Sequence, residues 1–85
     1  MYDPVRYLEK LNPSSIVVEV FRTNVCSKQV AQRIIADLAQ LIPNAKINFD
    51  LDDCDKILRI ECHHLVVENV VEILNKRSFL CEVLE

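Results

Sequence analysis

The sequence predicts an α+β domain of the ferredoxin-like βαββαβ class, a four-stranded antiparallel sheet with two helices on one face. Apolar residues follow strand-like or helical spacing in the order strand, helix, strand, strand, helix, strand, which is the split βαβ arrangement. A short polar turn joins the two middle strands as a hairpin. Right-handed crossovers then predict the spatial strand order four, one, three, two.

The composition is that of one small folded domain. The chain has 85 residues, of which 51% are hydrophobic and 27% are charged. Such a chain buries one modest core, and its apolar content argues against disorder. We expect an N-terminal appendage over 1–14 and the ferredoxin-like domain over 15–85.

The appendage carries a helix pattern of its own. Asp3-Pro4 is a capping residue followed by a first-turn proline. Apolar residues then recur at helical spacing, at Val5, Leu8 and Leu11. Because the segment 12–15 ends this pattern, we expect a short helix over about 4–11.

The first strand and first helix are predicted over 16–21 and from Ser27 to Pro43. The strand is rich in β-branched residues. Its alternation separates Val18 and Val20 from a second set that contains the charged residue Glu19. Ser27 can cap the helix and Pro43 ends it. The apolar stripe of this helix is Val30, Ile34, Leu38 and Leu41, widened by Ala31, Ile35 and Ile42.

The second half of the chain repeats the strand and helix signals. Clean alternation over 45–51 and 57–62 predicts a hairpin around the polar turn 52–55. A helix over about 65–76 and a short strand over 79–84 follow. On the third strand, Leu58 and Ile60 should face the core, with Arg59 and Glu61 on the outside.

Several function classes are disfavoured by composition. The net charge of −3 and the lack of aromatic residues on the third strand argue against a nucleic-acid partner. No apolar run reaches membrane-spanning length and no signal peptide is evident, so we expect a cytoplasmic protein. The chain has no glycine, which excludes glycine-rich phosphate loops. No nucleophile and base are placed together, so we expect no enzyme activity.

The stretch Asn24-Val25-Cys26-Ser27-Lys28-Gln29-Val30 resembles the metal-binding turn of the heavy-metal-associated domain, the module of copper chaperones and metal-transporting ATPases. The resemblance covers about residues 16–84 and includes Ser78-Phe79 before the last strand, where the family has glycine and an aromatic residue. Lys76 lies near a lysine that copper chaperones often carry. In this alignment Val25 takes the place of the family's core methionine.

The departure from that family lies at the metal pair. Ser27 and Val30 stand where the resemblance places the two metal-binding cysteines, and Cys26 stands one residue early. Serine is a poor ligand for soft metals and valine is none. The resemblance therefore implies the fold of the family without its usual metal site.

The four cysteines are expected to be reduced, because they lie in apolar periodic segments and no export signal is present. The alternative metal site, for Cu(I) or Zn, pairs Cys26 with Cys54 or with Cys26 of a second copy. The strand order places the loop with Cys26, the turn with Cys54 and the segment 76–79 at the same end of the sheet, and Cys62 with the two histidines at the opposite end. Soft ligands also occur at Cys62-His63-His64, although adjacent strand residues diverge. Cys81 is expected in the core.

We therefore expect a non-enzymatic binding or regulatory module without a cofactor; a metal carrier that uses Cys26 and Cys54 is the alternative. A protein partner or a second copy would bind the open face of the sheet or the edge strand 47–51. Opposite charges at Glu19 and Arg59 would form a cross-strand pair. The surface predicted for this contact is Val17, Glu19, Phe21, Ile57 and Arg59.

Overall fold

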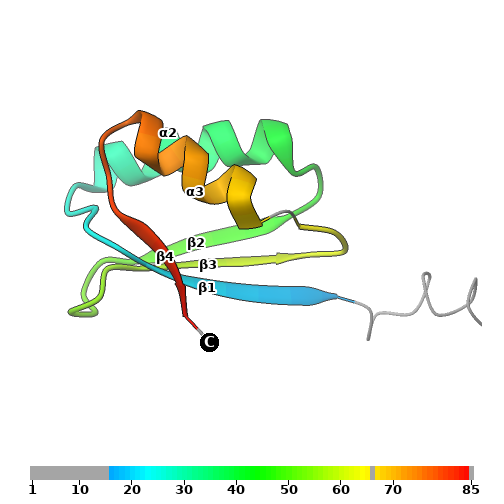
Figure 1. The fold of residues 1–85 in the computed structure, drawn as a ribbon, viewed down its shortest axis with the longest axis horizontal. Helices are drawn as coiled ribbons and strands as arrows, with labels where there is room; N and C mark the ends of the chain where they lie inside the picture. Colours follow the sequence, from blue (N-terminus) through cyan, green and yellow to red (C-terminus); the bar gives the residue numbers. More distant parts are fainter. Residues whose placement is uncertain (1–15, 66, 85) are drawn as a thin grey trace, which may run out of the picture.

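The structure, a computed structural model, describes residues 16–65 and 67–84, so the helix expected over 4–11 lies outside the described residues (Figure 1). The described elements alternate in the predicted order. They are β1 (Val17–Thr23), α2 (Lys28–Leu41), β2 (Lys46–Asp50), β3 (Ile57–Cys62), α3 (Val67–Lys76) and β4 (Cys81–Leu84).

The four strands form one antiparallel sheet in the order β2-β3-β1-β4. The two helices lie side by side on one face of it (Figure 1). The predicted spatial order of strands is confirmed, and this order is compatible with the ferredoxin-like arrangement. Neither described helix is long and apolar enough to cross a membrane.

The strand ends differ from the prediction at β1 and β4. β1 continues to Thr23, because Arg22 and Thr23 pair with Glu82 and Cys81 of β4. β4 begins only at Cys81. Cross-strand partners, which local sequence does not encode, therefore set both boundaries.

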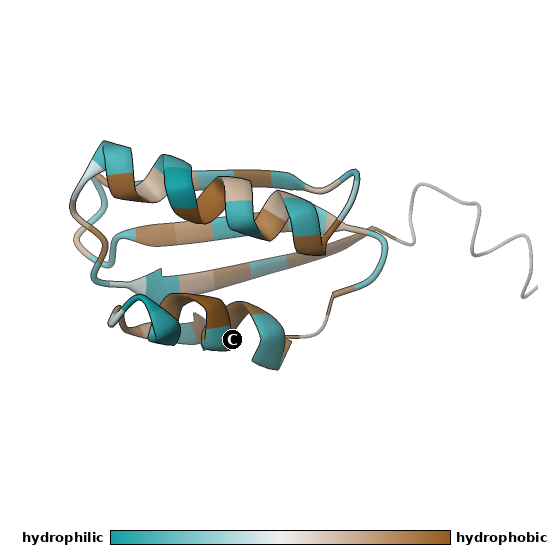
Figure 2. Cartoon of the chain, turned by 90° about the horizontal axis from the view of Figure 1, so that it is seen from above, coloured by the Kyte–Doolittle hydropathy of each residue, from teal (hydrophilic) through white to brown (hydrophobic). Residues whose placement is uncertain are grey.

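α2 begins where the sequence supplies a cap. Ser27 has extended backbone angles, φ −103° and ψ 130°, and its Oγ accepts a hydrogen bond from the amide of Val30 at 3.3 Å. Such a cap satisfies one of the free amides in the first turn of a helix. Apolar positions then recur along both helices (Figure 2), and in α2 they bury Ala31, Ile34 and Leu38.

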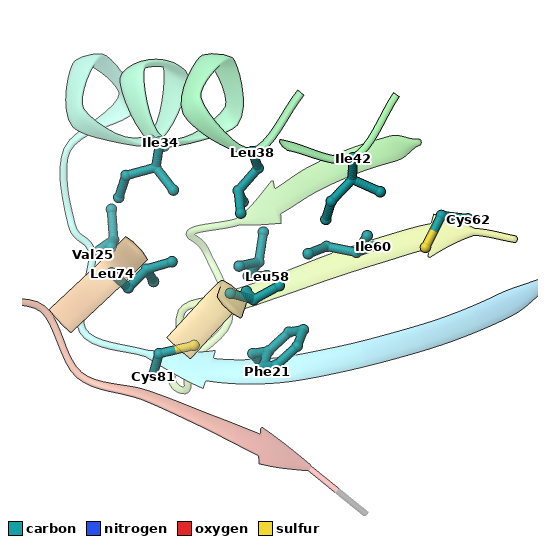
Figure 3. Packing of buried hydrophobic residues seen from close by; sticks show 12 residues of the cluster. Phe21, Val25, Ile34, Leu38, Ile42, Leu58, Ile60, Cys62, Leu74 and Cys81 are labelled. Atoms are coloured by element: carbon teal, nitrogen blue, oxygen red, sulfur yellow. The ribbon is translucent and has the colours of Figure 1, made fainter. Parts of the chain in front are cut away.

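The core lies between the helices and the covered face of the sheet (Figure 3). Phe21, Leu58 and Ile60 belong to the two central strands and are completely buried. Ile34, Leu38 and Leu74, from the two helices, pack against them. Val25, in the loop before α2, is also completely buried and closes one end of this core.

Because the chain has no glycine, its turns place other residue types in the left-handed region. Among the described residues these are Asn44, Lys56 and Ser78, with φ of 64°, 46° and 67°. Each costs roughly 1 kcal/mol relative to glycine. The Ser78 turn is stabilised by the amide of Phe79, which donates to the carbonyl of Leu74 at 3.0 Å, as at many helix C-termini.

Candidate functional site

One face of the sheet carries neither described helix, because α2 and α3 both cover the opposite face (Figure 1). The register shows which side chains point which way. Phe21 lies opposite Leu58, and both are buried beneath the helices. Since side chains alternate along a strand, Val18 and Val20 point to the open face.

Three apolar side chains form what we call the open-face stripe: Val18 and Val20 of β1, and Leu84 of β4. Val20 and Leu84 lie directly opposite each other in the β1–β4 pairing. Val18 is 45% exposed and Leu84 is 38% exposed, although both are large apolar residues. Ile16, also 45% exposed, precedes β1 beside the Val18 end of the stripe. Burying such side chains stabilises a complex by about 25 cal/mol per Å².

Two ion pairs flank the open-face stripe. Arg22 Nη2 lies 3.0 Å from Glu82 Oε1 and joins β1 to β4 beyond Val20. Arg59 Nη2 lies 2.8 Å from Glu61 Oε1 along β3. A hydrogen bond from Arg22 to Glu82, together with the negative charge of that carboxylate, raises the pKa of Arg22. The stripe is therefore a narrow apolar strip between fixed charges.

The structure corrects the surface predicted from the sequence. Phe21 is completely buried in the core, so it does not belong to the open face. Val17 lies opposite Cys62 and Glu19 lies opposite Ile60, and both of these partners are buried on the covered face.

The predicted pair between Glu19 and Arg59 does not form. Arg59 lies opposite Val20 instead of Glu19, and its guanidinium bonds Glu61. Ile57 and Arg59 are on the open face, as predicted, because they alternate with the buried Leu58 and Ile60.

The open-face stripe was missed because both faces of β1 are apolar. Each face also carries one charge, Glu19 on one and Arg22 on the other. The prediction took the charge of Glu19 as the sign of the exposed face, and so assigned Val17, Glu19 and Phe21 to the open side of the sheet. The size of Phe21 was the available signal, since the largest apolar side chain of a strand is the costliest to leave in water.

Three connections meet at one end of the sheet, and Thr23 joins two of them. Its amide donates to the carbonyl of Asp55 at 3.0 Å, and its hydroxyl donates to the carbonyl of Lys56 at 2.6 Å. The same hydroxyl accepts from the amide of Val25 at 3.2 Å. The loop before α2 and the turn between β2 and β3 are thus held together.

The third connection is attached through Asn24, whose Oδ1 accepts from the amide of Leu80 at 2.8 Å. These bonds confirm the prediction that the loop with Cys26, the turn with Cys54 and the segment before β4 lie at the same end of the sheet.

The two thiols of the alternative metal site, Cys26 and Cys54, are both exposed. The Cys26 Sγ lies 3.5 Å from the carbonyl of Asn24. Ligand atoms of Asp53, Cys54 and Asp55 lie within 4.8 Å of one another, the only such group of three in the described part of the chain. One thiolate with two carboxylates suits Zn(II) better than Cu(I), which prefers soft thiolates.

The other two cysteines are buried. Cys81 lies in the core, as predicted, where burial and the nearby charge of Glu82 raise the pKa of its thiol to about 11. The Sγ of Cys62 donates to the carbonyl of His64 at 3.4 Å. His63 and His64 are exposed beside a hollow of about 400 Å³, which also contacts the end of α2 at Leu41.

Comparisons with protein-family models, with curated proteins and with solved structures give no match for this chain.

Proposed function

We propose that this chain is a small non-enzymatic protein-binding module whose open-face stripe receives an amphipathic helix of a partner. The observation that carries the proposal is the exposure of Val18 and Leu84 on a sheet face that neither described helix covers, between two ion pairs. Contiguous apolar surface with a polar rim is typical of interaction sites.

The dimensions of the stripe favour a helix over a broad partner surface. Val20 and Leu84 stand on neighbouring strands, which lie about 5 Å apart. A helix is roughly 10–12 Å wide and presents one narrow apolar ridge. The opposite face of the same sheet already packs against two such ridges, from α2 and α3.

The relationship to heavy-metal-associated domains is part of this proposal. Its support is that Val25, at the position of the family's core methionine, is buried, and that Val30 packs against the core from the first turn of α2. A module of that kind without its metal pair keeps the scaffold and its surfaces, and these can serve in recognition.

The test is a selection of displayed helical peptides against the full chain. We expect enriched sequences with apolar residues at i, i+3 and i+4. Binding should fall at least about tenfold with Val18→Asp, because a charge would be buried in the contact. Leu41→Asp is the matched control, since Leu41 is 46% exposed on α2, away from the stripe. Peptides that bind both variants equally, or no enrichment at all, would contradict the proposal.

A metal carrier is the second candidate, favoured by the grouping of Asp53, Cys54 and Asp55. Native mass spectrometry after incubation with Zn(II) or Cu(I) under reducing conditions tests it. Loss of a stoichiometric ion with Cys54→Ser but not with Cys26→Ser would assign the site to this turn. Loss with either variant would assign it to the two thiols together. No retained ion in the parent protein would end the metal hypothesis.

A further inference from the structure

We propose that two copies of this chain pair through the edge strand β2, so that their two sheets join into one. In the described part of the chain, β2 lies at the edge of the sheet and pairs only with β3. An edge strand presents a row of backbone N–H and C=O groups, and such a row can pair with a strand of another chain. This contact is separate from the open-face stripe and concerns a different partner.

The side-chain order of β2 is complementary to itself. The strand reads Lys46-Ile47-Asn48-Phe49-Asp50. When two such strands run antiparallel about a twofold axis at Asn48, Lys46 of each copy lies opposite Asp50 of the other. Ile47 then lies opposite Phe49. Opposite charges in directly facing positions stabilise a strand pair, and like charges destabilise it.

The polar side chains of β2 are available for this contact. Lys46, Asn48 and Asp50 are exposed, and by alternation they point to the sheet face that neither described helix covers. Asp50 Oδ1 accepts a hydrogen bond from the amide of Asp52 at 3.2 Å, and the second oxygen of the carboxylate can meet a lysine. A lysine on an edge strand discourages pairing where it meets no anion. The charges therefore favour a second copy over an unrelated strand.

Apolar surface on the other side of β2 would be buried by the same contact. Ile47 and Phe49 are half-buried and pack against the core. Beside Phe49 is a hollow of about 370 Å³, which Ile35 of α2 also lines. Asn48 and Asp50 line this hollow too, although their side chains point to the opposite face, so it reaches the edge of the sheet. Because the twofold axis is perpendicular to the sheet, the hollows of both copies would meet at the junction.

The other edge strand is less suited to a second copy. β4 has only four residues, Cys81–Leu84, and its charged residue Glu82 has no cation on the same strand to meet. The Glu82 carboxylate is also held by Arg22 of the same chain at 3.0 Å. The structure therefore assigns the contact to β2.

Exchanging the charges tests the pairing in the full chain. Lys46→Asp should weaken dimerisation at least about tenfold, because two facing pairs of opposite charge become two pairs of like charge. Asp50→Lys should do the same. An equimolar mixture of the two variants should dimerise as the parent does, since every charge of one variant then meets its opposite on the other.

Sedimentation equilibrium over a range of concentrations measures each of these samples. A strand of five residues makes a small contact, below the roughly 800 Å² that each partner buries in a stable dimer, so we expect a weak dimer that depends on concentration. Lys76→Asp is the matched control. It makes the same change of charge on α3, where Lys76 is 73% exposed, and should leave dimerisation unchanged.

A disulfide cross-link tests the register. The background is Cys26→Ser with Cys54→Ser, which leaves the buried Cys62 and Cys81. Asn48→Cys should then cross-link two copies, because facing residues of antiparallel strands have Cα atoms about 4.5–5.5 Å apart, within the range of a disulfide. Val18→Cys should not, although Val18 is 45% exposed, because β1 lies two strands away from β2.

A parent protein that stays monomeric up to about 1 mM would overturn the proposal and would leave this edge to a strand of another protein. A dimer that ignores both charge variants would also overturn it, as would a mixture of the two variants that stays monomeric. Cross-linking through Val18→Cys would move the contact to the open face. A monomeric parent leaves the peptide selection unaffected, and failure of that selection leaves these measurements unaffected.

Discussion

At the scale of single residues, the cysteines fall into two chemical kinds. Cys26 and Cys54 are exposed on loops, whereas Cys62 and Cys81 are buried. A thiol must ionise before it reacts with an alkylating reagent or binds a soft metal. For Cys81 the surroundings oppose ionisation, because burial and then the charge of Glu82 raise its pKa to about 11.

We predict that Cys81 makes the fold less stable in alkali. An unfolded thiol ionises near the ordinary value of 9.0, whereas the folded one stays protonated to about 11. Between these values the folded state binds more protons, so the free energy of unfolding falls as pH rises from 9 to 11. The loss should be roughly 1–2 kcal/mol. Urea denaturation at pH 8, 9, 10 and 11 measures it.

The variant Cys81→Val should lose less stability over this pH range than the parent, because it has no thiol to ionise. Cys26→Ser is the control and should keep the parent's slope, since Cys26 is exposed. Identical slopes in the parent and Cys81→Val would show that another group dominates the alkaline behaviour.

β1 shows what single residues allowed us to predict. The alternation of β3 was clear from sequence, because Leu58 and Ile60 alternate with Arg59 and Glu61. β1 has an ambiguous pattern, and the charge of Glu19 indicated the wrong face. Glu19 lies opposite Ile60 on the covered face but is only half-buried, so its carboxylate keeps partial contact with water. Partial exposure of that kind depends on the three-dimensional packing.

At the scale of elements, the helices were the most predictable part of the fold. The spacing of Ile34 and Leu38 predicted the buried side of α2, and Ser27 with Pro43 marked its limits. The ends of β1 and β4 were harder to predict from the sequence. They depend on pairing between Thr23 and Cys81, residues far apart in the sequence.

The loop before α2 offers a test of the family resemblance. Ser27 Oγ lies 3.3 Å from the amide of Val30, so the two positions that would carry the metal cysteines are close. We predict that Ser27→Cys with Val30→Cys and Cys26→Thr binds one Cu(I) per chain. Two thiols at a helix N-terminus have lowered pKa values and suit this ion. Native mass spectrometry measures the stoichiometry.

The same change should lower the stability of the metal-free protein by about 2 kcal/mol. Roughly half of this comes from the lost serine cap and half from the half-buried valine. Metal should then raise the melting temperature through linkage. The single variant Cys26→Thr is the control and should show neither effect. A folded triple variant that binds Cu(I) no better than this control would show that the two positions do not form the family's site.

At the scale of the whole molecule, hydrogen bonds from two side chains hold together the loops that meet at one end of the sheet. Thr23 is 4% exposed and bonds both the β2–β3 turn and the loop before α2. Asn24 holds the segment that precedes β4. The sequence predicted that these connections meet, from strand order alone. The sequence did not indicate that Thr23 joins the β2–β3 turn to the loop before α2, because threonine is common in strands whether or not its hydroxyl bonds a neighbouring loop.

We therefore predict that Thr23→Val destabilises the whole fold, although valine has nearly the same shape and suits a strand. The substitution removes the donor to the Lys56 carbonyl, in a part-buried hydrogen bond, and the acceptor for the Val25 amide, in a buried one. Leaving such groups unpaired costs about 1–3 kcal/mol. Thr23→Ser keeps the hydroxyl and should lose less, mainly the contacts of one methyl group. Urea denaturation of both variants measures the difference. If Thr23→Val is as stable as Thr23→Ser, the Thr23 hydrogen bonds do not hold the β2–β3 turn to the loop before α2, and packing around Val25 and Phe21 must do so instead.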